Sequence, residues 1–298
     1  MERTFCYHIT EKDLPCCVGD YLRARGYSRQ ILIQLKKTCR GILVNGEWAY
    51  VRTPLKAGDR LETLLTEEAS SEKILPVRLP FSIVYEDQDL LVLDKPADMP
   101  VHPSVNNYDN TLANGVAYYF QEKGESFVFR CINRLDRDTT GLLILAKNAL
   151  SASLLSAQMK KRQIHRTYLA VTAGIPDPPA GTVDAPIGRK PDSAIERQID
   201  PEQGERAVTH YQVLDSRSSY SLVQLRLETG RTHQIRVHMK SIGCPLLGDY
   251  LYHPDFSLIG RTALHSSQLS FVHPITQKQL HFCVPLPKDM AGLFPQDA

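Results

Sequence analysis

Short apolar runs recur along the chain after residue 80, and they constrain the fold more than any other feature of the sequence. They predict strands, and residues 220–228 alternate apolar and polar side chains as a half-buried strand does. The runs lie at 82–85, 90–93, 142–146, 168–172 and 220–228. Segments with helical periodicity at 111–122 and 149–162 interrupt them, without a strict alternation of strand and helix. We therefore predict an α+β fold with a mixed, mainly antiparallel sheet and flanking helices.

The amino-terminal part differs in charge. Residues 21–60 hold nine basic and two acidic residues, a net charge of +7 within a chain whose formal net charge is +2. Two short amphipathic helices are predicted, one over 18–26 and one after an N-cap at Ser28, followed by a hairpin at Asn45-Gly46. Such a patch is typical of a nucleic-acid-binding surface, and a solvated basic surface is the alternative. Four cationic residues lie on the second helix or at its ends: Arg29, Lys36, Lys37 and Arg40.

A stretch without periodicity separates the two parts of the chain. It is acidic, rich in small residues and bounded by proline, with the sequence TEEASSEKILPVRLP, which is typical of a linker. We therefore predict a small αβ domain at 1–66, a linker at 67–80 and a larger domain at 81–298.

Missing patterns exclude several classes of protein. The chain has no phosphate-binding loop, no dinucleotide-type glycine pattern, no serine-hydrolase elbow and no helix-borne zinc motif. Its seven cysteines are odd in number and scattered, which favours a reduced, cytoplasmic location. No apolar stretch approaches the ~20 residues of a membrane span, and no signal-peptide core begins the chain. We expect no bound metal, no cofactor and no contact with membranes.

The most unusual stretch is INRLDRDTTGLLILAK, at 132–147. It places Asp136 between Arg134 and Arg137, in a loop that leads into a buried strand, where proteins often present functional groups. Guanidinium groups nearby keep a carboxylate ionised and oriented, as a nucleophile or a substrate-binding anion requires. The alternative is that Asp136 and Asp138 only cap a turn.

A second stretch, LETGRTHQIRVHMKSIGCPLLGD, follows the alternating strand. It predicts a helix that has Thr232 as N-cap, ends near Gly243 and projects Arg236 from its first or second turn. Two basic clusters in the larger part favour binding of a polyanion over solvated helix faces. They are Arg226, Arg231, Arg236 and Lys240, and Lys160, Lys161, Arg162 and Arg166.

Several motifs follow one another over nearly the whole chain. They include LLVLDKPADMPVHPS (90–104), INRLDRDTTGLLILAKN (132–148), RTYLAV (166–171), GRTHQIRVHM (230–239) and PLLGDYLY (245–252). In this order they resemble the pseudouridine synthases that modify ribosomal and transfer RNA, a large family often called the RluA type. Residues 15–65, with LVNG and KAGDRL, resemble the small RNA-binding domain named after ribosomal protein S-four.

The resemblance implies an isomerase that needs no metal and no cofactor and that flips a uridine out of structured RNA. Asp136 then matches the family's catalytic carboxylate, which either attacks the ribose anomeric carbon or abstracts a neighbouring ribose proton. Tyr168 matches a tyrosine that stacks on the uracil and accepts a proton, with a buried strand tyrosine as the alternative. Arg236 matches the partner of the aspartate. Further contacts to RNA are expected from Arg134, Arg137, Arg231 and His233.

The resemblance also sets the expected partners. Large-subunit ribosomal RNA is the first expected substrate and transfer RNA the second, and we expect a monomer without an obligate protein partner. Two other functions stay open at this point. One is an inactive RNA-binding protein of the same fold, and the other is a glycosylase that uses a carboxylate on the same glycosidic bond but lets water finish the reaction.

Overall fold

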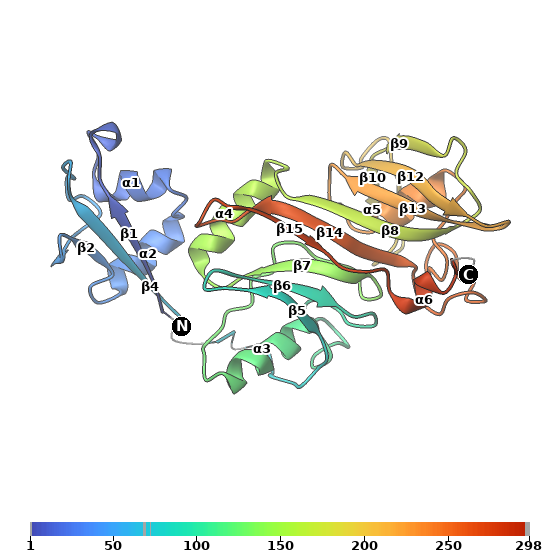
Figure 1. The fold of residues 1–298 in the computed structure, drawn as a ribbon, viewed down its shortest axis with the longest axis horizontal. Helices are drawn as coiled ribbons and strands as arrows, with labels where there is room; N and C mark the ends of the chain where they lie inside the picture. Colours follow the sequence, from blue (N-terminus) through green and yellow to red (C-terminus); the bar gives the residue numbers. More distant parts are fainter. Residues whose placement is uncertain (1, 68–69, 72, 296–298) are drawn as a thin grey trace.

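The computed structural model describes residues 2–67, 70–71 and 73–295, and its larger part is built on a nine-stranded sheet (Figure 1). The strand order is β5-β6-β7-β14-β8-β13-β12-β9, and β15 pairs with β14. The strands are β5 (Ser82–Glu86), β6 (Leu90–Lys95), β7 (Thr140–Ala146), β8 (His165–Ala173), β9 (Ala180–Asp184), β12 (Val208–Ser216), β13 (Tyr220–Leu227), β14 (Leu264–Val272) and β15 (Gln279–Cys283). Among these strands the β7–β14 pair is parallel and the other pairs are antiparallel. The predicted fold class is confirmed.

The helices beside this sheet begin where the sequence supplies caps. The Thr111 side chain accepts a hydrogen bond from the Asn114 amide at the start of α3 (Leu112–Glu122). The Asn148 side chain caps α4 (Ala149–Lys160) in the same way, through the Ser151 amide. Both helices lie within one or two residues of the ranges that periodicity predicts. Two shorter helices, α5 (Gln234–Ser241) and α6 (Lys288–Ala291), follow later in the chain. A separate two-stranded sheet pairs β10 (Ile187–Arg189) with β11 (Arg197–Ile199).

The amino-terminal unit is a four-stranded sheet with two helices. The sheet order is β1-β4-β2-β3, and the helices are α1 (Val18–Ala24) and α2 (Arg29–Lys37). The strands are β1 (Glu2–His8), β2 (Ile42–Val44), β3 (Glu47–Trp48) and β4 (Arg60–Thr66). Asn45 and Gly46 both have positive φ, as a two-residue hairpin turn requires, and Ser28 caps α2 through the Ile31 amide. The sequence analysis did not predict β1, which pairs along its whole length with β4.

Residues 67–80 contain neither helix nor strand among the positions that the structure describes, but they do not form a free tether. The Val77 amide donates to the carbonyl of Asn114 in α3, and the Asn114 side chain donates to the carbonyl of Leu75. The Ser71 side chain accepts from the Phe129 amide at 3.1 Å. This segment therefore packs along the larger part of the chain. The domain boundaries at 66 and 80 stay a prediction.

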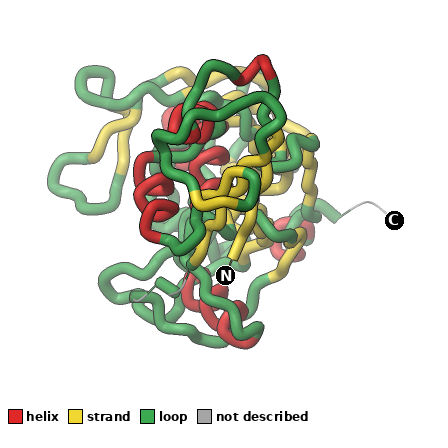
Figure 2. The backbone as a smooth tube through the Cα atoms, turned by 90° about the vertical axis from the view of Figure 1, so that its left-hand side faces the viewer, coloured by secondary structure: helices red, strands yellow, loops and turns green. Residues whose placement is uncertain are grey.

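The amino-terminal unit packs directly against α4. Leu150 of α4 belongs to the apolar core of this unit, and Leu154 packs against the same core. The Ser153 hydroxyl donates to the carbonyl of Gly26 at 2.8 Å. Gly26 has a φ of +89°, and a Cβ there would lie 2.4 Å from Leu154 Cδ2, so a larger residue would strain the backbone and displace the Leu154 side chain. Figure 1 shows the two parts end to end with α4 between them, and in the view along the long axis (Figure 2) the two parts overlap.

A charged contact next to α4 also joins the two parts. Arg3 of β1 donates two hydrogen bonds to Asp89, in the turn between β5 and β6, at 2.9 and 2.8 Å. Asp89 also accepts from the side chain of Asn148, the residue that caps α4. Strand β1, the β5–β6 turn and α4 therefore meet at one buried carboxylate, which is 4% exposed.

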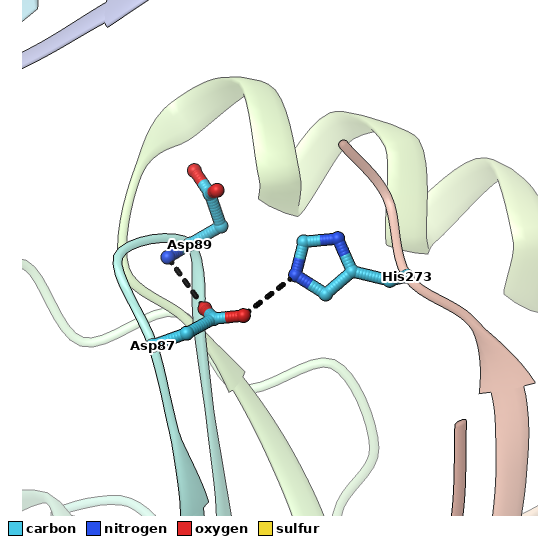
Figure 3. Close-up of side chains that lie close together, drawn as sticks. All are labelled: Asp87, Asp89 and His273. Carbon is cyan, nitrogen blue, oxygen red and sulfur yellow. Dashed lines mark hydrogen bonds and ion pairs between the residues drawn. The ribbon is translucent and has the colours of Figure 1, made fainter. Parts of the chain in front are cut away.

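Asp89 lies within reach of Asp87 and His273, as Figure 3 shows, and the three side chains are close enough to surround a cation. Their ligand atoms are already bonded to protein donors. Asp87 accepts from the amides of Asp89 and Leu90 and from His273 Nε2. His273 Nδ1 accepts from two backbone amides, which fixes the proton on Nε2. These bonds assign the cluster a structural role.

Replacing Arg3 with alanine is expected to lower the free energy of unfolding by about 2 kcal/mol. The change leaves a buried carboxylate without its cation, and the cost stays below the ~3–5 kcal/mol of a fully buried pair because Arg3 is partly exposed. Urea unfolding measures the difference. Arg23→Ala is the matched control, since its ion pair with Asp20 is exposed on both sides and contributes little. An equal effect of the two substitutions would contradict a joining role for Asp89.

Candidate active site

The loop that carries Asp136 precedes β7, and hydrogen bonds from Lys95 hold its backbone in place. The buried Lys95 ammonium donates to the carbonyls of Pro96, Met99 and Arg137 at 2.7, 2.9 and 2.8 Å. Burial lowers the pKa of Lys95 to about 7, an effect that the charges of Asp138 and Asp136 only partly offset. These bonds hold the backbone next to Asp136, whose own side chain stays one third exposed.

Arg236 joins Asp136 to a second aspartate, Asp249. Its Nη1 donates to Asp136 Oδ2 at 2.9 Å, while Nε and Nη2 donate to the two oxygens of Asp249 at 2.7 Å each. Burial alone would lower the pKa of Arg236, but the hydrogen bonds and charges of Asp249 and Asp136 raise it above its usual value. Arg236 is therefore a fixed cation that orients the carboxylate of Asp136.

This geometry corrects one prediction about Arg236. The sequence analysis grouped it with exposed cations for polyanion binding, yet its side chain is 2% exposed, whereas Lys240 on the same helix is exposed. The difference follows from the two aspartates, because a guanidinium group is buried at low cost only where acidic partners accept its hydrogen bonds.

The start of α5 differs by one residue from the prediction. Its N-cap is His233, with left-handed φ and ψ of 58° and 18°, rather than Thr232. The buried side chain of Gln234 holds this turn in place. Its Oε1 accepts from the Arg231 amide and the Thr229 hydroxyl, and its Nε2 donates to the Val208 carbonyl. The turn thereby places His233 and Arg236 on the side that faces Asp136.

Tyr168 lies on β8 at the wall of a small cavity of about 60 Å³ next to Asp136. Its neighbours across the sheet are Leu225 and Ser266. The side chain is 4% exposed, and Asp136 and Arg236 line the same cavity. Tyr168 is thus both a buried strand tyrosine and a neighbour of Asp136, so the two readings made from the sequence do not exclude each other.

A wide cleft of about 1160 Å³ opens over this cavity and shares Arg134, Asp136 and Arg231 with it. Arg137 also lines the cleft and contacts Asp138 and Asp98, and Arg231 pairs with Glu205. The cationic and imidazole side chains along the cleft are His102, Arg134, Arg137, Lys160, Arg162, His165, Arg166 and Arg231. A cleft lined by so many cationic side chains favours binding of a polyanion over binding of a small apolar ligand.

The structure does not bring all predicted site residues together. Arg29, Lys36, Lys37 and Arg40 are exposed on α2 and just after it, in the amino-terminal unit rather than in the cleft. His233 lines the small cavity, where its Nε2 lies 3.8 Å from Asp136 Oδ2. Asp249 holds Arg236 in place and Lys95 holds the loop of Asp136, and the sequence analysis assigned neither of them a role.

Comparison with known proteins gives one consistent result. A family model described as RNA pseudouridylate synthase matches residues 89–241. The chain is 43% identical over 276 residues to "Uncharacterized RNA pseudouridine synthase YjbO" of Bacillus subtilis (strain 168), covering 93% of this chain and 97% of that protein. It is 41% identical over 276 residues to "Ribosomal large subunit pseudouridine synthase D" of Zymomonas mobilis, covering 85% of each.

Solved structures agree. "Human RNA Pseudouridylate Synthase Domain Containing 4" matches with a TM-score of 0.57 and 28% sequence identity, covering 70% of this chain and 90% of that chain. Within the described ranges, none of the helices combines the length and apolar character that crossing a bilayer requires.

Proposed function

We propose that this chain, which belongs to the RNA pseudouridylate synthase family and is an isomerase that makes pseudouridine in RNA, acts on large-subunit ribosomal RNA through the carboxylate of Asp136. The single observation that carries the assignment of Asp136 is its ion pair with the buried Arg236, which Asp249 holds from the other side. An ionised carboxylate needs no general base to act as a nucleophile. The names of relatives such as the Zymomonas mobilis protein support the ribosomal substrate.

The reaction exchanges one glycosidic bond for another. The bond from the ribose C1′ to uracil N1 breaks, a bond from C1′ to C5 forms, C5 loses its proton and N1 gains one. Asp136 starts this exchange at the ribose, by attack on C1′ or by removal of the neighbouring proton. In this proposal Tyr168, on the wall of the same cavity, stacks on the detached uracil and accepts the C5 proton.

A stacked uridine cannot reach this cavity, so the RNA has to release it. Flipping a base out costs a few kcal/mol, which contacts to the RNA backbone offset. Arg134, Arg137 and Arg231 supply such contacts at the mouth of the cavity, and the basic end of α4 extends them along the cleft. We place the enzyme in the cytoplasm, where ribosomal RNA is found, and we propose that it acts as a monomer.

The amino-terminal unit adds a second RNA-binding surface in this proposal. Its cationic side chains on α2 are exposed, and α4 connects the unit to the cleft, because Leu150 packs in the amino-terminal core while Lys160 lines the cleft. A second binding surface held at a fixed position raises the effective concentration of the RNA at the first.

Replacing Lys36 and Lys37 together with glutamine is expected to weaken RNA binding without changing kcat. Each lost phosphate contact lowers the slope of log K against log salt by roughly 0.7–0.9. Filter binding at several salt concentrations measures the slope, and single-turnover rates at saturating RNA measure the chemical step. The control variant, Lys12→Gln with Lys278→Gln, also removes two exposed charges. If both double variants bind RNA equally, α2 is not an RNA-binding surface.

The substrate is tested by mapping pseudouridines in total RNA from cells with and without the gene, using carbodiimide-dependent stops of reverse transcription. The proposal predicts that at least one site in large-subunit ribosomal RNA disappears on deletion. The wild-type gene should restore it, and the Asp136→Asn form should not. Sites lost only from transfer RNA would overturn the ribosomal assignment and favour the second expected substrate. Loss of no site would favour an inactive RNA-binding protein.

A further inference from the structure

A chain of polar contacts leads from β11 to the carboxylate of Asp136 through the side chains of Tyr252 and His233. The Arg197 amide, in β11, donates to the hydroxyl of Tyr252 at 2.8 Å. The same hydroxyl lies 2.9 Å from His233 Nδ1, and the other ring nitrogen of His233, Nε2, lies 3.8 Å from Asp136 Oδ2. The His233 ring packs edge-on against the Tyr252 ring, with centroids 5.7 Å apart.

The directions of these hydrogen bonds follow from counting protons. Burial raises the pKa of Tyr252 to about 12, so its hydroxyl keeps its hydrogen at neutral pH. Within the part of the chain that the structure describes, the hydroxyl has two hydrogen-bond partners, and it accepts from the Arg197 amide. Among the described residues, His233 Nδ1 is the acceptor that this geometry offers to its own hydrogen, and we assign the bond in that direction. A neutral imidazole that accepts at Nδ1 carries its single hydrogen on Nε2, the nitrogen that faces Asp136.

Burial keeps the ring of His233 neutral. Burial lowers the pKa of His233 and outweighs the attraction of Asp136, and the positive charge of Arg236 lowers it further. The other charged groups facing the ring are Asp249, in the loop after α5, and Arg197 of β11. Among the described residues, both contacts recorded for the Asp136 carboxylate are to Oδ2, from Arg236 and from His233.

We propose that His233 is a positioning residue, in which Tyr252 fixes the ring with Nε2–H turned toward Asp136 Oδ2, so that Oδ1 is left free to react at the ribose. At 3.8 Å the Nε2–H contact is longer than a hydrogen bond, and it shortens when RNA closes over the cavity. The left-handed backbone at His233 supports this role, because a non-glycine residue adopts it at a cost and the Gln234 side chain holds it in place.

The proposal rests on the function assigned to Asp136, so its first test needs no activity. The tautomer of His233 is read from nitrogen-15 NMR of protein labelled at histidine, with the signals assigned by their loss in His233→Gln. At pH 7 the free protein should show a neutral ring protonated at Nε2. In Tyr252→Phe, which keeps the ring contact and removes the hydroxyl, a mixture of tautomers is expected. A charged ring, or a proton on Nδ1 in the wild-type protein, would overturn the proposal.

Kinetics give the second test. Tyr252→Phe should lower the single-turnover rate by about ten-fold with little change in KM, as loss of a partner that orients a histidine commonly does. The acid limb of the pH–rate profile of Tyr252→Phe should move to higher pH, because the lost hydroxyl no longer favours the neutral form of the His233 ring. A charged ring would compete with the substrate for Asp136. The single-turnover rate of His233→Ala should be lower still. His233→Gln should recover part of the rate, because its amide N–H reaches the position of Nε2–H.

The control is Tyr220→Phe, which also removes a hydroxyl hydrogen bond, to the Leu293 carbonyl, far from Asp136 in the sequence. It should leave the rate and the pH profile unchanged. Wild-type rates and an unshifted acid limb in Tyr252→Phe and His233→Ala, with Asp136→Asn inactive, would overturn the positioning role and leave the proposed function intact. A wild-type protein that makes no pseudouridine in any RNA would instead overturn the proposed function.

Discussion

Replacing Asp136 with asparagine is expected to lower the rate of pseudouridine formation by at least ~10⁴-fold, the scale seen when a catalytic side chain is removed. Asparagine fills the same space and still accepts a hydrogen bond from Arg236, but it has no charged oxygen to attack C1′ or to remove a ribose proton. The measurement is the single-turnover rate with an RNA transcript, together with the dissociation constant of the same RNA. RNA binding should survive, because the cationic side chains of the cleft are untouched.

Asp98→Asn serves as the control for this substitution. Asp98 is an exposed carboxylate that contacts Arg137 at the cleft, so its loss removes the same charge outside the proposed chemistry. It should retain a rate within a few fold of the wild type. An Asp136→Asn variant that keeps more than a hundredth of the wild-type rate would show that another group supplies the reacting atom.

Asp249→Asn is expected to have the second largest effect, on stability and on rate together. Asp249 is fully buried and accepts two of the three side-chain hydrogen bonds of Arg236. Without its charge, the partly exposed Asp136 is the one acidic partner left to the buried guanidinium among the described residues. Breaking a buried pair costs about 3–5 kcal/mol, and we expect about 3 kcal/mol here because the amide still accepts one hydrogen bond. Urea unfolding and the single-turnover rate measure the two effects.

The rate should fall because Arg236 no longer holds Asp136 in one orientation. Asp255→Asn is the control, a change of the same chemistry in the same loop at a residue that bonds mainly to the nearby Ser257 amide. It should leave both the unfolding midpoint and the rate nearly unchanged. If Asp249→Asn unfolds at the same urea concentration as the wild type, the Arg236–Asp249 pair is not the support of the site.

The local patterns of the sequence predicted α3, α4 and five of the nine strands of the large sheet, but not β9, β12, β14 or β15. Ser28 caps α2 as its position predicted, and β7 is buried along its whole length, as its uninterrupted apolar run suggested. Strand β1 was missed because its alternation is weak in the sequence: Phe5 is its one buried residue, and Arg3 and Tyr7 on the same face are only half-buried. Its partner β4 lies more than fifty residues away, and a pairing at that distance leaves no mark on the local sequence.

The active site could be predicted in part. Asp136 and Arg236 were identified as partners through the family resemblance, since no periodicity relates two residues that are 100 positions apart. The burial of Arg236 and the role of Asp249 could not be predicted, because they depend on a loop that returns to α5 only in the folded chain. The PLLGDYLY motif contains Asp249 and Tyr252 and was the one sequence feature that pointed to this loop. The motif does not indicate which residues Asp249 and Tyr252 contact.

The measurement that tests the central claim most directly uses RNA labelled with tritium at C5 of uridine. Isomerisation replaces the C5–H bond with the bond to C1′, so each pseudouridine formed releases one tritium into water. With purified protein and a large-subunit ribosomal RNA transcript, we predict tritium release equal to the pseudouridine found after digestion, with the RNA chain and its bases intact. Release of free uracil with abasic sites would contradict isomerisation and show a glycosylase, and no tritium release would contradict catalysis altogether.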